Sequence, residues 1–173
     1  PLKSDPRAVL DAGCGKGDFT FYLAEKYPQA QVEGWDKADD DLHELGQNIQ
    51  ICEQIRRISG LANTSFYKKD LRELSSRDQY DLIVSIHVLE YIQGNQEILE
   101  KFFAALRPGG QLHLQMPSVH EGRFPLLQKY TDMNEWMESE HTGELYSMEQ
   151  MLKALRRIGF TILRRRTDGH FLA

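Results

Sequence analysis

Short apolar runs alternate along the chain with longer segments in which apolar side chains recur at helical spacing. The short runs are typical of strands buried in a parallel sheet, and the longer segments are typical of helices that pack one face against it. Strands are predicted at residues 8–12, 31–36, 64–68, 81–86, 111–116 and 160–166. Helices are predicted at 18–27, at 95–106, from Ser147 to the residue before Gly159, and over the stretch that carries Leu42, Leu45, Ile49, Cys52 and Ile55.

This alternation of strands and helices predicts the fold class, a doubly wound, mostly parallel α/β sheet that takes up residues 1–173 as a single domain. In such sheets ligands bind outside the carboxyl ends of the strands, near the point where the strand order reverses. The chain begins almost on its first predicted strand and stops inside another. We therefore expect the last strand to be incomplete and residues to be missing at either end.

The bulk composition is that of a globular domain, with 40% hydrophobic and 27% charged residues. No apolar run has the roughly 20 residues that a membrane span needs. A net charge of −5 without a long basic run disfavours nucleic acid as a partner. Cys14 and Cys52 lie far apart in the sequence and form no metal-ligand cluster, so no metal is expected and the cysteines indicate reduced thiols in a cytoplasmic protein.

The most informative segment runs from residue 9 to residue 19, where an apolar run meets Asp11 and then glycines at positions 13, 15 and 17. Glycine is needed where a strand turns sharply into a helix or where the backbone approaches a ligand closely. A purely structural loop is one interpretation. Dinucleotide binding is disfavoured, because Asp18 replaces the third glycine of that fingerprint and a carboxylate at Asp11 would repel a pyrophosphate. A ligand that carries an ammonium group suits this turn better.

Asp36 ends the second predicted strand. A carboxylate at this place, beside a glycine-rich turn, can accept hydrogen bonds from both hydroxyls of a ribose. The structural alternative is an acid that caps a helix or is solvated.

These segments, together with residues 32–36, Asp70, residues 85–92 and residues 108–110, resemble in order the motifs of the class I S-adenosylmethionine-dependent methyltransferases, of the type that acts on small molecules. The resemblance implies a seven-stranded, Rossmann-like sheet, with S-adenosylmethionine as cofactor and S-adenosylhomocysteine as product. It implies that the methionine part is held by Asp11, Gly13, Cys14, Gly15 and Gly17, the ribose by Asp36, the adenine by Lys37, Asp70 and Leu71, and the reactive end by the backbone of Ser85, Ile86 and His87.

The residues that would meet the substrate are less well defined. His87 is a candidate general base, although a packed histidine that fixes its loop is an equal alternative. Tyr91 stands where the family often has a histidine. Residues 117–146, which include Tyr130, are expected either to cover the substrate or to pack as a helix on the sheet, and His141 is a further candidate for substrate contact.

The expected activity is transfer of a methyl group from S-adenosylmethionine to a small-molecule acceptor by in-line displacement. Such a reaction mainly requires alignment of the acceptor and exclusion of water, so no catalytic residue is assigned. The alternatives are a cofactor-binding module without catalysis, which would act as a sensor or as the partner of an active subunit, and a methyltransferase for RNA or protein. The sequence leaves open the acceptor and the oligomeric state.

Overall fold

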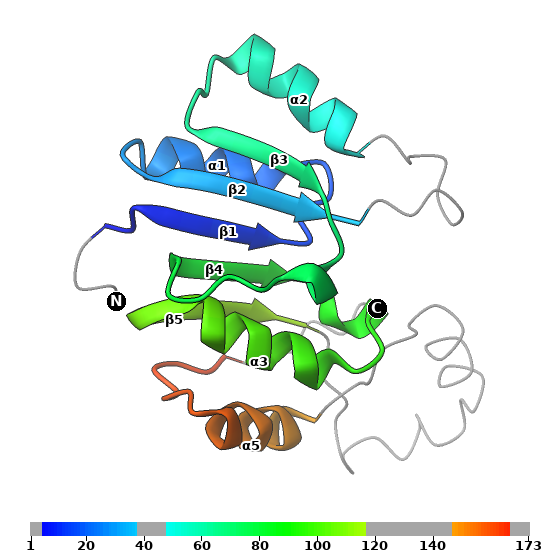
Figure 1. Ribbon diagram of the computed structural model, residues 1–173, viewed down its shortest axis with the longest axis vertical. Helices are drawn as coiled ribbons and strands as arrows, with labels where there is room; N and C mark the ends of the chain where they lie inside the picture. Colours follow the sequence, from blue (N-terminus) through cyan, green and yellow to red (C-terminus); the bar gives the residue numbers. More distant parts are fainter. Residues whose placement is uncertain (1–4, 38–47, 117–146, 167–173) are drawn as a thin grey trace.

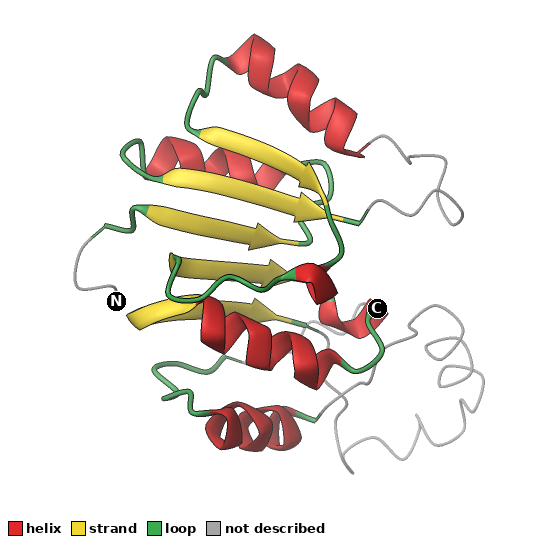
Figure 2. Cartoon of the chain, in the orientation of Figure 1, coloured by secondary structure: helices red, strands yellow, loops and turns green. Residues whose placement is uncertain are grey.

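The structure is a computed structural model that describes residues 5–37, 48–116 and 147–166. Five strands form one parallel sheet in the order β3-β2-β1-β4-β5 (Figures 1 and 2). In chain order the elements are β1 (Ala8–Ala12), α1 (Asp18–Lys26), β2 (Gln31–Asp36), α2 (Asn48–Ser59), β3 (Thr64–Lys68), the 3-10 helix η1 (Leu71–Glu73), β4 (Tyr80–Ile86), the 3-10 helix η2 (Leu89–Tyr91), α3 (Asn95–Ala105), β5 (Leu106–Gln115) and α5 (Met148–Ile158).

The predicted doubly wound parallel sheet is confirmed, with β1, β2 and β3 at the predicted residues. The predicted strand at 160–166 is wrong, because this segment is neither helix nor strand. Phe160 and Ile162 are half-buried against the core, so the alternating pattern reports burial correctly. A strand also needs a hydrogen-bonded neighbour, and no strand in the described ranges pairs with this segment. The described sheet accordingly has five strands where seven were expected.

β5 begins earlier than the sequence predicts. Tyr80 pairs with Leu106 and Leu82 pairs with Gln111, so the intervening residues 107–110 form a bulge inside the strand rather than a turn before it. Gly109 has a φ of +84° in this bulge. Residues 108–110 lie between the predicted helix and the predicted strand, and in the structure they bend an edge strand of the described sheet.

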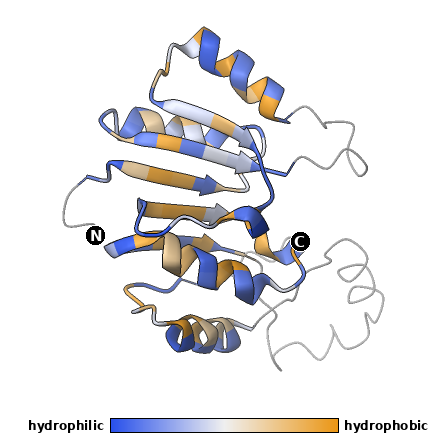
Figure 3. Ribbon diagram, in the orientation of Figure 1, coloured by the Kyte–Doolittle hydropathy of each residue, from blue (hydrophilic) through white to orange (hydrophobic). Residues whose placement is uncertain are grey.

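Alternation along the strands divides the core into two layers. Leu10 and Ile83 face α3 and α5, whereas Val9, Leu82 and Val84 face α1. Figure 1 shows α1 and α3 on opposite faces of the sheet, and Figure 3 shows that β1 and β4 in its middle are largely hydrophobic. Such two-sided burial explains why these strands appear as continuous apolar runs.

The last described helix starts and ends at the predicted residues. The Ser147 hydroxyl accepts from the backbone N–H of Gln150 at 3.2 Å, and the Gln150 side chain accepts from the backbone N–H of Ser147 at 2.8 Å, which completes a capping box. Gly159 follows the helix with a φ of +122°. Among the residues that the structure describes, none of the helices combines the length and the apolar character that crossing a bilayer requires.

The strand order reverses between β1 and β4. The chain passes from β1 to β2 on one side and returns to the other side of β1 as β4. Both strands point the same way, so the segments that follow them meet at one edge of the sheet. This edge is where a doubly wound sheet holds its ligand.

Candidate functional site

The glycine loop, residues 13–17, leaves β1 in a conformation that only glycine adopts readily. Gly13, Gly15 and Gly17 have φ values of +84°, +52° and +85°, in the left-handed region, which confirms that the sharp turn after β1 requires glycine. The backbone N–H groups of Gly13 and Cys14 both donate to the carbonyl of Trp35, at 2.8 and 2.9 Å. The loop is therefore fixed to the carboxyl end of β2.

Cys14 lies in a small apolar cluster below this loop, with Cys52 and Phe66. Both are free thiols, and each sulfur lies near the carbonyl oxygen of Gly15, at 3.8 Å for Cys14 and 3.5 Å for Cys52. A hydrogen bond to Cys52, together with burial, raises the pKa of the Cys14 thiol. The fold thus brings together two cysteines that the sequence places far apart, and Cys52 ties α2 to the loop.

Asp11 is the most unusual charged residue of this edge. It is 3% exposed, and its Oδ2 accepts a hydrogen bond of 2.6 Å from the Thr20 hydroxyl. Burial, with a further contribution from the charge of Asp36, raises the pKa of Asp11 to about 6, against the opposing effect of the Thr20 bond. A carboxylate that is costly to ionise here would be stabilised by a positively charged group of a ligand. Contacts of Asp11 with the methionine part of S-adenosylmethionine stay predictions.

Asp36 lies at the end of β2, as predicted, and contacts the glycine loop directly. Its Oδ2 accepts a hydrogen bond of 2.7 Å from the backbone N–H of Gly15. A carboxylate has about four lone-pair sites, so this bond leaves acceptor capacity for hydroxyl groups. The role of Asp36 toward a ribose stays a prediction.

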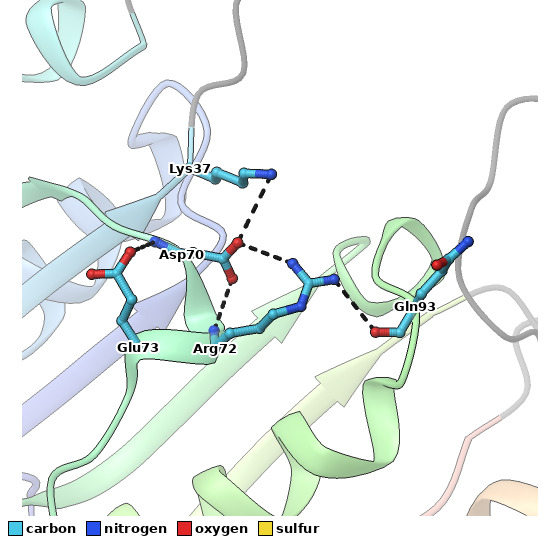
Figure 4. Close-up of polar contacts among 5 residues, drawn as sticks. All are labelled: Lys37, Asp70, Arg72, Glu73 and Gln93. Carbon is cyan, nitrogen blue, oxygen red and sulfur yellow. Dashed lines mark hydrogen bonds and ion pairs between the residues drawn. The ribbon is translucent and has the colours of Figure 1, made fainter.

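Asp70 follows β3 and caps η1 (Figure 4). Its carboxylate accepts from the backbone N–H of Arg72 at 2.8 Å, bonds the Arg72 guanidinium at 3.0 Å and lies 3.8 Å from the Lys37 ammonium. Arg72 also donates to the carbonyl of Gln93 at 3.4 Å, which links this loop to the segment after η2. The side chain of Leu71 is buried in the core. Contacts of Lys37, Asp70 and Leu71 with an adenine stay predictions.

The segment after β4 carries the remaining described candidates. Ser85 is fully buried and Ile86 is half-buried against the layer of α1. His87 has a φ of +55°, a backbone conformation that residues other than glycine seldom adopt. Its Nδ1 lies 3.1 Å from Oε1 of Glu90, and its Nε2 lies 3.2 Å from Nε2 of Gln115 on β5. Tyr91, at the end of η2, is 52% exposed.

Glu90 and Gln115 are site residues that the sequence analysis missed. Glu90 lies only three residues after His87, but His87 has a positive φ and precedes η2, so the contact does not follow from a helical spacing. Gln115 comes from a neighbouring strand and gave no local signal. Tyr130, His141 and the rest of 117–146 lie outside the described residues, so those predictions stay untested.

A cavity of about 410 Å³ lies elsewhere, over β2 and β3 on the face of α3. Its polar groups bind one another: Glu33 accepts from Trp35 Nε1 at 3.2 Å and from the Tyr80 hydroxyl at 2.9 Å. The Lys69 ammonium stands 4.3 Å from the centre of the Trp35 ring. This cavity lies away from the glycine loop, and we do not assign it to the site.

Comparison with known proteins agrees with this geometry. Residues 3–158 match the family described as "Methyltransferase domain". A trans-aconitate 2-methyltransferase of Streptomyces coelicolor is 29% identical over 138 residues, which are 79% of this chain and 44% of the relative. One of Deinococcus radiodurans is 34% identical over 113 residues, 65% of this chain and 39% of the relative. The chain thus spans less than half the length of these two relatives.

A solved structure shares the fold. Phosphoethanolamine N-methyltransferase 2 of Haemonchus contortus, solved in complex with S-adenosylmethionine, superimposes with a TM-score of 0.75 at 22% identity, covering 92% of this chain and 34% of that one. Because the family match extends over most of the sequence, the chain belongs to the methyltransferase-domain family, and its resemblance to the class I S-adenosylmethionine-dependent methyltransferases is confirmed.

Proposed function

We propose that the protein transfers a methyl group from S-adenosylmethionine to a small-molecule acceptor and releases S-adenosylhomocysteine. The observation that supports this most is the buried carboxylate of Asp11, which lies at the switch point of the sheet directly before the glycine loop. A chain of this family that keeps a poorly solvated negative charge at this place is suited to a cationic ligand. Fold alone would not identify the activity.

The chain's own residues would hold the cofactor along the carboxyl edge of the sheet. Asp11 and the glycine loop, with Cys14, would hold its methionine part, Asp36 its ribose, and Lys37, Asp70 and Leu71 its adenine, with Ser85, Ile86 and His87 beside the reactive end. When bound, the cofactor supplies a methyl carbon that is activated by the sulfonium. The protein then needs to align the acceptor and exclude water.

We infer that the acceptor is a small polar metabolite. The relatives are named for trans-aconitate and phosphoethanolamine, which are both small and charged. The net charge of −5 gives little attraction for the phosphates of RNA. These two compounds are the first acceptors to test, with radiolabelled methyl groups counted in the product. Binding of the cofactor without transfer to any acceptor would favour the binding module instead.

Replacing Asp36 by alanine is expected to weaken S-adenosylmethionine binding by at least about tenfold. The variant loses the acceptor for two ribose hydroxyls and also the bond to the Gly15 N–H. Calorimetric titration of the cofactor into both proteins measures the difference. The Asp36→Asn variant keeps one carbonyl oxygen for Gly15, so it separates the loop contact from the charge-assisted bonds.

The matched control is Asp5→Ala, which removes an exposed carboxylate before β1 and should leave binding unchanged. Equal affinity of the wild type and Asp36→Ala would contradict the ribose assignment. Failure of the folded wild type to bind at all would contradict the proposed function itself.

A further inference from the structure

His87 is held in an unfavourable backbone conformation by its surroundings. Only His87 and Asp78 have positive φ among the non-glycine residues of the described ranges. The backbone N–H of His87 donates to the carbonyl of Gln115 at 2.9 Å, which fixes the residue to β5. Strain of this kind costs on the order of 1–3 kcal/mol and is commonly found at functional sites. This backbone conformation places the imidazole of His87, which is 54% exposed, at the carboxyl edge of the sheet.

The partners of the two ring nitrogens of His87 are compatible with one tautomer, which carries its proton on Nδ1. The Glu90 carboxylate can only accept, so the proton of a neutral ring lies on Nδ1 and points at Oε1, 3.1 Å away. The side-chain amide N–H of Gln115 then donates to the lone pair of Nε2 at 3.2 Å. Nε2 is therefore the basic nitrogen.

Burying the carboxylate of Glu90 at this position costs free energy unless a positive charge lies beside it. The side chain is 1% exposed, and its Oε2 lies buried without a hydrogen-bond partner in the part of the chain that the structure describes. A buried carboxylate oxygen without a partner destabilises the fold. A positive charge on the neighbouring imidazole would offset that cost.

This pair lies beside the glycine loop. A Cβ placed on Gly13 would come within 2.2 Å of Val88 Cγ2, so the loop after β1 touches the residue next to His87. The pair and the loop thus line the two sides of the switch point between β1 and β4.

We propose that Glu90 is a positioning residue that holds His87 as a general base through Nε2, and that the acceptor consequently carries a proton on the atom that is methylated. This inference rests on the proposed function and names its substrate class: a hydroxyl or a protonated amine, in contrast to a carboxylate, which is already ionised at neutral pH and needs no base.

The step balances in charge and in protons. For a hydroxyl, the oxygen lone pair bonds to the methyl carbon, the bond from that carbon to sulfur breaks with its electrons left on sulfur, and the hydroxyl proton passes to Nε2 of His87. A protonated amine has no lone pair, so its proton passes to Nε2 first and the neutral nitrogen then attacks the methyl carbon. In both cases a positive charge appears on the imidazolium, next to the buried Glu90 carboxylate. Gln115 can then turn its amide to offer the oxygen to the new N–H.

The first test reads the tautomer and requires no acceptor. In ¹⁵N-detected histidine side-chain spectra, the wild type should show His87 as a single tautomer with the proton on Nδ1. Glu90→Met removes the acceptor with little change in volume and should leave both tautomers populated. Its thermal unfolding midpoint should equal or exceed that of the wild type, because a buried carboxylate with one unpartnered oxygen is replaced by an apolar group. If the wild type carried the proton on Nε2, the proposal that Glu90 holds the Nδ1 tautomer of His87 would be wrong.

The second test measures methyl transfer from S-adenosylmethionine to phosphoethanolamine, to small alcohols and to trans-aconitate. For acceptors that carry a proton, His87→Gln should lower kcat by about 100-fold or more and Glu90→Met by about tenfold, with little change in KM. His113→Gln, which removes an exposed histidine from β5, is the matched control and should retain activity.

The outcomes separate the two proposals. Methylation of trans-aconitate alone, unaffected by either variant, would overturn the substrate class. Reduced stability of Glu90→Met with unchanged kcat would make Glu90 merely structural. No transfer to any acceptor by a wild type that binds the cofactor would count against the proposed function, while the tautomer spectra still decide the His87–Glu90 pair.

Discussion

The Gly13→Ala variant is expected to have a free energy of unfolding about 3 kcal/mol lower than the wild type. The residue has a φ of +84°, which costs an L-residue about 1–2 kcal/mol. The added Cβ would also lie 2.2 and 2.7 Å from the two γ-carbons of Val88. Such overpacking costs roughly a further 1–3 kcal/mol. Val88 cannot move away easily, because it lies on a short loop fixed by η2. Denaturant-induced unfolding measures the change.

Two companion variants divide this cost into its causes. Gly60 has a φ of +70°, and a Cβ there would meet no atom within 4 Å, so Gly60→Ala should lose only about 1 kcal/mol. Adding Val88→Ala to Gly13→Ala should recover part of the loss by removing the clash. If Gly13→Ala and Gly60→Ala were equally stable, the contact between the two loops would be refuted.

The Asp11→Asn variant is expected to be more stable than the wild type at pH 8, by up to about 3 kcal/mol. Burial raises the pKa of Asp11 to about 6 from its ordinary value of 3.8, so the folded state holds this proton more tightly than the unfolded state. The wild type should therefore lose stability as pH rises from about 4 to about 6 and remain at the lower level above pH 6. Asparagine keeps an acceptor for the Thr20 hydroxyl and removes the charge.

Unfolding curves recorded between pH 4 and pH 8 test this expectation. At pH 4 the two proteins should be nearly equal in stability, which serves as the internal control. At pH 8 the stabilised variant should bind S-adenosylmethionine about tenfold more weakly, because it lacks the carboxylate that offsets the ligand's positive charge. A variant that is less stable than the wild type at pH 8 would contradict the cost assigned to this buried carboxylate.

Local chemistry explains which features could be predicted from the sequence. The glycine loop and the helix start at Ser147, with its capping box, depend on residues within a few positions of one another, and both the loop and the helix start were predicted correctly. The capping box of Asp70 with Glu73 had the same kind of signal but was not predicted. The sequence predicts a ligand contact for Asp70, and its bonds to the backbone and side chain of Arg72 are visible only in the structure.

The remaining features depend on contacts between distant segments. His87 meets Gln115 only because β4 and β5 pair in register, with Ile86 opposite Gln115. Cys14 meets Cys52 because α2 packs beside the glycine loop. The strand predicted at 160–166 is wrong for the same reason, because a strand depends on a neighbouring strand that no local pattern specifies.

The pairing of β1 with β4 has a consequence for how the protein forms during synthesis. Val9 pairs with Leu82, so the pairing of these strands closes a loop of the chain that includes α1, β2, α2 and β3. Such long closures are slow compared with local pairing. A nascent chain that has emerged only as far as β3 has the glycine loop and Asp36 but lacks β4 and the segment that follows it. The carboxyl edge on both sides of β1 is therefore complete only after β4 has left the ribosome.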